Sequence, residues 1–239
     1  FVLATISNIV TNLYYSDNPE AASPTWTNAG DINADTNTGA PNWESADMVW
    51  DTVNNNLWVV YGCVTVGDAN SYDLKYRRIT AIGTTPSFGA ETDAMSASST
   101  LTYSHPTIAI MGDSGTNKVV FFANEHLDGA ATRNISMRTI TLDAATLGTT
   151  RVLDTAWTAN AASGLLGVTR MNTDKNVLFY YNGTNILATR HDDSSDIDVA
   201  AGWDALNGTD ASRTTISADD PTATAVGSTA GDTDSDTVW

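Results

Sequence analysis

The residues whose types and spacing could bind a metal ion lie near the end of the sequence. Asp232, Asp234 and Asp236 alternate with other residues in the run GDTDSDTVW. Carboxylate oxygens at alternate positions of a turn can face inward around a hard cation such as Ca²⁺. Thr237 stands where a calcium loop would carry glycine, and the alternative is an acidic turn exposed to solvent. Calcium is therefore the one cofactor that the sequence suggests.

Arginines recur at similar places in three similar segments. Arg77 lies in KYRRIT, Arg138 in SMRTIT and Arg190 in LATRHD. Repeated units inherit repeated residues, and a lone arginine on a third strand can pair with an acidic loop nearby. We favour this local pairing over a shared binding role for the three arginines.

Motifs of nucleophilic, metal-dependent and nucleotide-dependent catalysis are absent from the sequence. It contains no G-x-S-x-G, no H-E-x-x-H and no phosphate-binding glycine pattern, and its three histidines share no metal-ligand spacing. The four glutamates lie in loop-like sequence, with no tyrosine expected to pair with them: Glu20, Glu44, Glu91 and Glu125. We therefore predict no catalytic residue, and the sequence leans away from an enzyme.

Tryptophans in the polar connecting segments are the candidates for ligand binding. An exposed ring there could stack on a sugar or anchor a protein partner. The alternative is that each ring fills the space between neighbouring sheets. The four candidates are Trp26, Trp43, Trp157 and Trp203.

A repeated pattern must position all of these residues. It consists of an apolar run, a polar turn ending in Asn or Asp, and a second run rich in aromatic and β-branched residues, and each copy predicts a β-hairpin. The five copies begin at Phe1, Asp47, Pro106, Leu165 and Pro221. Turn residues of the last four copies follow one another at 61, 59 and 60 residues: Asn56, Asn117, Asn176 and Asp236.

The length of this repeat predicts a β-propeller, because a third strand candidate follows three of the hairpins and leaves room for a fourth. We expect an all-β fold with four-stranded antiparallel blades, four of them complete and a fifth begun, as part of a longer chain. One propeller region would cover residues 1–239, with blades at 1–44, 45–103, 104–162, 163–217 and an incomplete 218–239. A β-sandwich or β-solenoid built from the same hairpins is the alternative.

The blade pattern resembles the sialidase-like β-propellers, whose blades often carry an Asp-box, S-x-D-x-G-x-T-W, between the third and fourth strands. Ser23, Thr25 and Trp26 match the end of such a box, whereas its Asp and Gly are not at their places. In that family, arginines from several blades bind a substrate carboxylate, and a Tyr/Glu pair and an Asp complete the site. The resemblance implies an irregular propeller and a link to carbohydrates.

The amino-acid composition limits the classes of partner that the chain could bind. The formal charge of -17 disfavours nucleic acids and anionic membrane surfaces, and no apolar run reaches the roughly 20 residues that span a bilayer. With 24 Asp, 36 Thr and only 3 Lys, the composition is typical of an extracellular, virion or cell-surface β protein. We expect further chain or a protein partner to cover the open blade edges, and glycans are the expected ligands.

Three functions are consistent with these observations. The first, which we favour, is a non-enzymatic extracellular or virion surface propeller that acts as an assembly platform or attaches to glycans. The second is a carbohydrate-active enzyme, a sialidase-like hydrolase or lyase, with catalytic residues partly outside this chain. The third is a purely structural repeat in a larger extracellular assembly. Fold alone does not separate them.

Overall fold

The computed structural model forms two compact units, residues 1–106 and 107–239. Strands and turns make up nearly all of the described residues, which include no α-helix and hence no helix that could cross a membrane. The predicted all-β class is therefore confirmed. The residues described are 2–7, 10–32, 46–64, 72–80, 85–98, 100–127, 132–144, 146–158, 166–170, 175–181, 186–199, 202–204, 214–217, 231–232 and 237–238.

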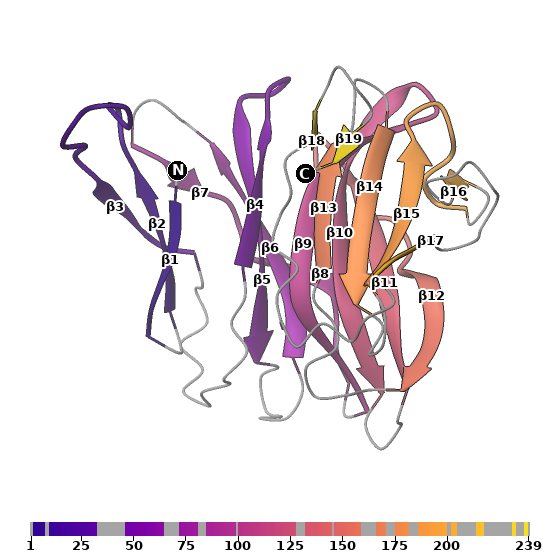
Figure 1. Cartoon of the computed structure of the whole chain (residues 1–239). Helices are drawn as coiled ribbons and strands as arrows, with labels where there is room; N and C mark the ends of the chain where they lie inside the picture. Colours follow the sequence, from indigo (N-terminus) through magenta and orange to yellow (C-terminus); the bar gives the residue numbers. More distant parts are fainter. Residues whose placement is uncertain are drawn as a thin grey trace. The chain divides into compact units, whose positions relative to one another are not determined.

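The first unit contains two antiparallel sheets (Figure 1). The first sheet has the order β1-β2-β3, with strands β1 (Val2–Ser7), β2 (Val10–Tyr15) and β3 (Thr27–Asp31). The second sheet has the order β4-β5-β6-β7, and β8 also pairs with β6. Its strands are β4 (Ala46–Asp51), β5 (Asn56–Val64), β6 (Tyr72–Thr80), β7 (Ser87–Phe88) and β8 (Thr92–Met95).

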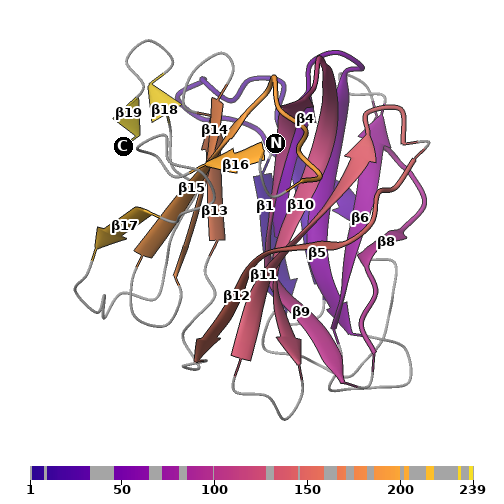
Figure 2. The same ribbon diagram turned by 90° about the vertical axis from the view of Figure 1, so that its right-hand side faces the viewer.

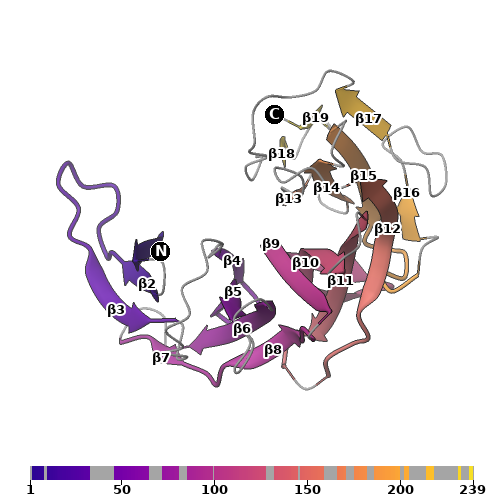
Figure 3. The ribbon, with the colours of Figure 1, turned by 90° about the horizontal axis from the view of Figure 1, so that it is seen from below.

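The third sheet has four antiparallel strands in sequence order, with β9 and β12 at its edges (Figure 3). They are β9 (Leu101–Asp113), which begins in the first unit, β10 (Thr116–Leu127), β11 (Thr132–Thr141) and β12 (Arg151–Thr158). Figure 2 shows β12 running beside β11. This sheet has the four-stranded arrangement predicted for a blade.

The second unit also holds the fourth and fifth sheets. The fourth has the order β13-β14-β15-β16, with β17 paired to β15. Its strands are β13 (Leu166–Arg170), β14 (Lys175–Tyr181), β15 (Ile186–Asp192), β16 (Trp203–Asp204) and β17 (Thr214–Ser217). A fifth, two-stranded sheet pairs β18 (Gly231–Asp232) with β19 (Thr237–Val238).

Four of the predicted hairpins are present, as the pairs β1/β2, β4/β5, β9/β10 and β13/β14. In the fifth copy, β18 comes from the predicted turn segment and pairs with β19, while the first apolar run, from Pro221, lies outside the described residues. Each repeat encodes its hairpin locally, because the polar turn reverses the chain and the two apolar runs pair across it. In the β9/β10 turn, Ser114 and Gly115 both have positive φ, at 47° and 92°. This geometry fits the right-handed twist of the paired strands. The predicted blade boundaries stay predictions.

In the second, third and fourth sheets, the outermost strand is interrupted. In the second sheet, β7 pairs with the end of β6 and β8 with its beginning. In the gap, the Gly89 amide donates to the Arg78 carbonyl at 2.9 Å. The third sheet repeats this bond, from the Gly148 amide to the Thr139 carbonyl at 2.8 Å. In the fourth sheet, β16 and β17 both pair with β15. Glu91 lies in the gap of the second sheet, between β7 and β8.

Each unit buries an apolar core between its sheets. In the first unit, Leu13 and Ile32 pack against Leu57, Val59 and Tyr61 of the second sheet. In the second unit the core lies between the third and fourth sheets. Its largest buried side chains include Met111, Phe122, Met137, Tyr180 and Trp203.

Candidate functional site

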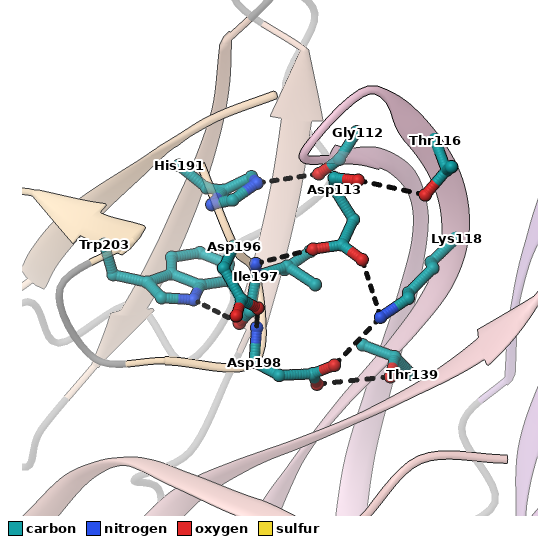
Figure 4. A network of polar contacts seen from close by, with 10 residues as sticks. All are labelled: Gly112, Asp113, Thr116, Lys118, Thr139, His191, Asp196, Ile197, Asp198 and Trp203. Carbon is teal, nitrogen blue, oxygen red and sulfur yellow. Dashed lines mark hydrogen bonds and ion pairs between the residues drawn. The ribbon is translucent and has the colours of Figure 1, made fainter. Parts of the chain in front are cut away.

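A network of polar side chains joins the third and fourth sheets (Figure 4). The Lys118 ammonium on β10 contacts Asp113 Oδ2 at 2.7 Å and Asp198 Oδ2 at 2.9 Å. Asp113 ends β9, and Asp198 lies in the loop after β15. Thr139 on β11 donates its hydroxyl to the other oxygen of Asp198 at 3.2 Å. We call Asp113, Lys118 and Asp198 the lysine bridge.

The loop after β15 is shaped by its own aspartates. Asp192 Oδ1 accepts the amide of Ser194 at 3.0 Å and its hydroxyl at 2.6 Å. Asp196 Oδ1 accepts the Asp198 amide at 2.9 Å, and the Ile197 amide donates to Asp113 Oδ1 at 3.1 Å. Aspartates favour such turns because their short carboxylates reach backbone amides two residues on. These bonds hold Asp198 toward Lys118.

His191, at the end of β15, is fully buried between the two sheets. Its Nδ1 lies 2.8 Å from the Gly202 carbonyl oxygen, and its Nε2 lies 2.8 Å from the Gly112 carbonyl oxygen. The ring packs against buried Trp203 with centroids 5.1 Å apart, and the Trp203 indole donates to the Ile197 carbonyl at 3.1 Å. Each ring nitrogen of His191 therefore lies against a buried backbone carbonyl, one on β9 and one beside β16.

Asp193 adds a second crossing beside His191. Its Oδ1 accepts the Gly112 amide at 2.8 Å and the Asn176 side-chain amide at 2.7 Å, and its Oδ2 pairs with Arg170 at 2.7 Å. Position 112 requires glycine here, because a Cβ would lie 2.2 Å from the Asp193 Cβ. The backbone of β9 thus approaches the loop of the next sheet more closely than any side chain would allow.

Opposite charges set the ionisation of this network. Burial alone would raise the pKa of Asp113, but hydrogen bonds from Lys118 and the Ile197 amide, together with the Lys118 charge, lower that pKa below its ordinary value. The Ser194 hydroxyl and amide lower the pKa of Asp192. Burial would lower the pKa of Lys118, whereas its bonds to Asp113 and Asp198 raise it overall. The bridge is a charged cluster at neutral pH.

These pKa directions predict acid sensitivity of the second unit. A carboxyl whose pKa is lower in the folded state stabilises the fold fully above its unfolded pKa. For Asp113 and Asp192 this stability is lost as the pH falls from their ordinary value of 3.8 toward the folded value. We expect the urea midpoint to be lower at pH 3 than at pH 6. An unchanged midpoint, measured by tryptophan fluorescence, would contradict the assigned bonds.

Lys118 occupies the position that a cation would take between Asp113 and Asp198. In the part of the chain that the structure describes, no group of three histidine, cysteine, aspartate or glutamate side chains could hold a metal ion. Both carboxylates are neutralised and hydrogen-bonded, so they are poorly placed to transfer protons to a substrate. The lysine bridge therefore has a structural role: it joins the third and fourth sheets.

A Tyr–Glu pair, which the sequence analysis did not expect, lies in the second sheet. Tyr61 on β5 donates its hydroxyl at 2.5 Å to Glu91, which sits in the gap between β7 and β8. Arg77 and Lys75 of β6 each lie 3.9 Å from the Glu91 carboxylate, and Lys75 pairs with Asp93 at 2.8 Å. The expectation was wrong because the interrupted outer strand turns Glu91 back over the sheet.

This pair has the residue types of a catalytic Tyr/Glu couple but not its environment. Tyr61 is only 2% exposed. Burial, followed by the hydrogen bond to Glu91 and the charge of Glu91, raises the pKa of Tyr61 above its ordinary value. The hydroxyl therefore stays protonated and acts as a donor, whereas nucleophilic attack needs an activated oxygen within reach of a substrate. The pair fastens the outer strand to the sheet.

Replacing Tyr61 with Phe is expected to lower the free energy of unfolding of the first unit by about 1–2 kcal/mol, since a hydrogen bond to a charged group is lost. In this variant the Glu91 carboxylate still has Arg77 and Lys75 beside it, and their positive charges limit the loss of stability. Chemical denaturation measures this effect. As a control, Tyr15→Phe changes a half-buried tyrosine of β2, and a loss as large as that of Tyr61→Phe would argue against the pair.

The structure places the four predicted ligand-binding tryptophans differently. Trp26 is 41% exposed before β3 and stays a candidate. Trp203 is fully buried beside His191, so its ring cannot stack on a ligand here, and the prediction is corrected in favour of the space-filling alternative. Burial follows from its position at the entry to β16, which faces the third sheet. Trp43 and the Trp157 side chain lie outside the described residues.

The predicted calcium ligands are not brought together in the described part of the chain. Asp232 lies on β18, and its side chain is outside the description, as are Asp234 and Asp236 altogether. The calcium site therefore stays a prediction.

The repeated arginines do lie on third strands, β6, β11 and β15. Arg77 faces Glu91 of its own sheet, and Arg138 donates Nε to the Gly148 carbonyl at 2.6 Å in the gap of its own outer strand. On the neighbouring second strands, the residues opposite Arg77, Arg138 and Arg190 are Val59, Phe121 and Val177 respectively. Arg77 thus makes the local acidic pairing that we favoured, whereas Arg138 bonds locally to a backbone carbonyl.

The segment that matches the end of an Asp-box lies in a different connection from the one expected. Ser23, Thr25 and Trp26 fall between β2 and β3, the second and third strands of the first sheet. In the sialidase-like β-propellers the box lies between the third and fourth strands of a blade. The match is therefore one of residue types and not of structural position.

Of the comparisons with known proteins, the one with solved structures bears on the fold. No protein-family model matches the sequence, and no curated protein matches it. Among solved structures, the chain is similar to the endo-arabinase from Bacteroides thetaiotaomicron VPI-5482. The two share 10% sequence identity and a TM-score of 0.54, over 89% of this chain and 74% of that chain.

The fold is of the β-propeller type. That endo-arabinase is a β-propeller glycoside hydrolase, and the likeness supports a distant relationship at the level of the β-propeller fold. It confirms the predicted fold class of antiparallel blades, but it does not support the sialidase-like Asp-box resemblance.

Proposed function

We propose that this chain is a carbohydrate-active β-propeller that hydrolyses glycosidic bonds in a polysaccharide. The observation that carries the proposal is the structural likeness to an endo-arabinase over 89% of the chain. Enzymatic action on a carbohydrate was the second function considered from the sequence, and this likeness favours it over a non-enzymatic surface role. An extracellular or surface location, and a partner or further chain at the blade edges, stay predictions.

Glycoside hydrolysis requires a pair of carboxyl groups, one of which donates a proton to the leaving oxygen. Glu125, at the end of β10, is the described carboxylate that best suits this role. Its Oε1 accepts from the Asn134 amide at 2.8 Å and its Oε2 from the Ser136 hydroxyl at 2.7 Å. Neutral donors orient the carboxylate without committing it to an ion pair, unlike the carboxylates of Asp113 and Asp198.

A matched pair of variants tests this proposal. The full chain is incubated with arabinan and a panel of other plant polysaccharides, and new reducing ends are measured alongside binding. We expect cleavage of at least one polysaccharide, a loss of about 100-fold or more in kcat for Glu125→Gln, and retained binding. Glu91→Gln, in the buried Tyr61 pair, should keep most activity. Binding without cleavage would favour the non-enzymatic glycan-attachment role.

A further inference from the structure

A cavity of about 330 Å³ lies in the second unit, between β12 and the loop after β15. Met137 and Ile197, both fully buried, form its floor, and half-buried Leu153 forms a wall. Val152 and Val199 stand at its mouth with 46% and 44% of their surface exposed. The volume falls at the lower end of the range of small-molecule sites, about 300–1,000 Å³.

The exposed valines distinguish this cavity from the rest of the surface. Four large apolar side chains are exposed in the described part of the chain, and Val152 and Val199 are two of them; the others are Trp26 and Val53. Single exposed apolar residues are common, but their clustering around an apolar hollow is typical of a binding site.

Two charged side chains line the cavity, and they differ in whether they are free to bind a ligand. Asp198 lines the cavity, but its carboxylate is already bound by Lys118 and Thr139. Arg151 also lines it and is exposed, and its guanidinium makes no hydrogen bond or ion pair with any other described residue. The cationic groups of Lys75, Lys118 and Arg170, by contrast, each contact a carboxylate. Among the described residues of this acidic chain, the Arg151 guanidinium is therefore open to an anionic ligand.

We propose that this cavity binds a small amphiphilic carboxylate, an aliphatic or aromatic acid. Its apolar part would pack on Met137, Leu153 and Ile197, and its carboxylate would accept hydrogen bonds from Arg151. Guanidinium groups bind carboxylates through two parallel bonds, and burial of the apolar part supplies the rest of the affinity. The proposal does not depend on the proposed hydrolase activity.

A sugar fits the same cavity less well. Sugar hydroxyls need several hydrogen-bond partners when they are buried, and an unpaired hydroxyl is costly. Five of the seven lining side chains are apolar and none is aromatic, so the cavity offers neither enough polar partners nor a stacking surface.

The proposal is tested by isothermal titration calorimetry, in which octanoate is titrated into the full chain. From the size of the ligand we expect a Kd of about 0.1–1 mM. Acetate, which has the charge without the chain, and 1-octanol, which has the chain without the charge, should each bind about 10-fold more weakly or worse. Galacturonate distinguishes a sugar acid from an apolar acid, and binding as tight as that of octanoate would overturn the proposal.

Two variants locate the site. Arg151→Gln, a surface change, should weaken octanoate binding about 10-fold, and Val199→Asn should weaken it several-fold. Arg78→Gln removes the same charge from the second sheet and should leave the affinity unchanged. Absence of octanoate binding, or equal affinity for the wild type and Arg151→Gln, would show that the cavity is not the site.

Discussion

Replacing His191 with Phe is expected to lower the free energy of unfolding of the second unit by about 2–5 kcal/mol. The phenyl ring keeps the packing against Trp203 but leaves the carbonyls of Gly112 and Gly202 without the ring nitrogens that now lie 2.8 Å from each. An unsatisfied buried acceptor costs about 1–3 kcal/mol, and two are created here. Chemical denaturation measures the loss.

Graded variants separate this effect from a change of shape. His191→Gln keeps one polar group that can donate to a carbonyl, so its loss should be smaller than that of His191→Phe. His126→Phe, at a partly exposed position on β10, serves as the matched control and should cost less than about 1 kcal/mol. Equal losses for His191→Phe and His126→Phe would contradict a bridging role.

Both His191 contacts can be hydrogen bonds together only while both ring nitrogens carry a proton, because a carbonyl oxygen only accepts. Nitrogen chemical shifts of a labelled ring report which of the two nitrogens carries a proton. A ring nitrogen without a proton would mean that the carbonyl beside it is satisfied in another way.

Replacing Lys118 with Met is expected to destabilise the second unit by about 2–4 kcal/mol at pH 7, since breaking a largely buried ion pair leaves an uncompensated charge. Asp113 and Asp198, with 13% and 25% of their side chains exposed, would lose their shared cation and repel each other. At pH 3, below the ordinary value of 3.8 for the Asp113 carboxyl, the stabilisation that comes from its lowered pKa is partly lost, so the difference from the wild type should shrink. Urea denaturation at both pH values measures it.

Lys75→Met provides the matched control for this change. Lys75 also contacts two carboxylates, Glu91 and Asp93, but it belongs to the first unit and Asp93 is 44% exposed. Exposed pairs contribute only about 0–1 kcal/mol, so the control should lose less stability than Lys118→Met. A larger loss for Lys75→Met would show that burial does not decide the strength of these bridges.

Local structure was predictable because it depends on neighbours in sequence. Each hairpin needs only an apolar run, a turn residue and a second run, and the repeats supply all three within about 20 residues. The same locality places Arg77, Arg138 and Arg190 on third strands. The acidic run from Asp192 to Asp198 follows the same rule, because its carboxylates accept amides close by.

Contacts between distant segments were not predictable in the same way. Glu91 meets Tyr61 across 30 residues, and the cause is the interruption of an outer strand that no residue pattern announced. Trp203 looked like an exposed ring because polar residues surround it in sequence. Its burial depends on the third sheet, which packs against it from more than 60 residues away.

The sequence by itself therefore determined the all-β class, the first four hairpins and the strands that carry the arginines, since alternation and turn chemistry act over a few residues. Only the tertiary structure decided which charges meet. Lys118 and Asp198 are 80 residues apart, and Asp113 and Ile197 are 84 apart, yet they bond across two sheets. Composition and spacing carry no information about such pairs, because the packing of one sheet on the next selects them.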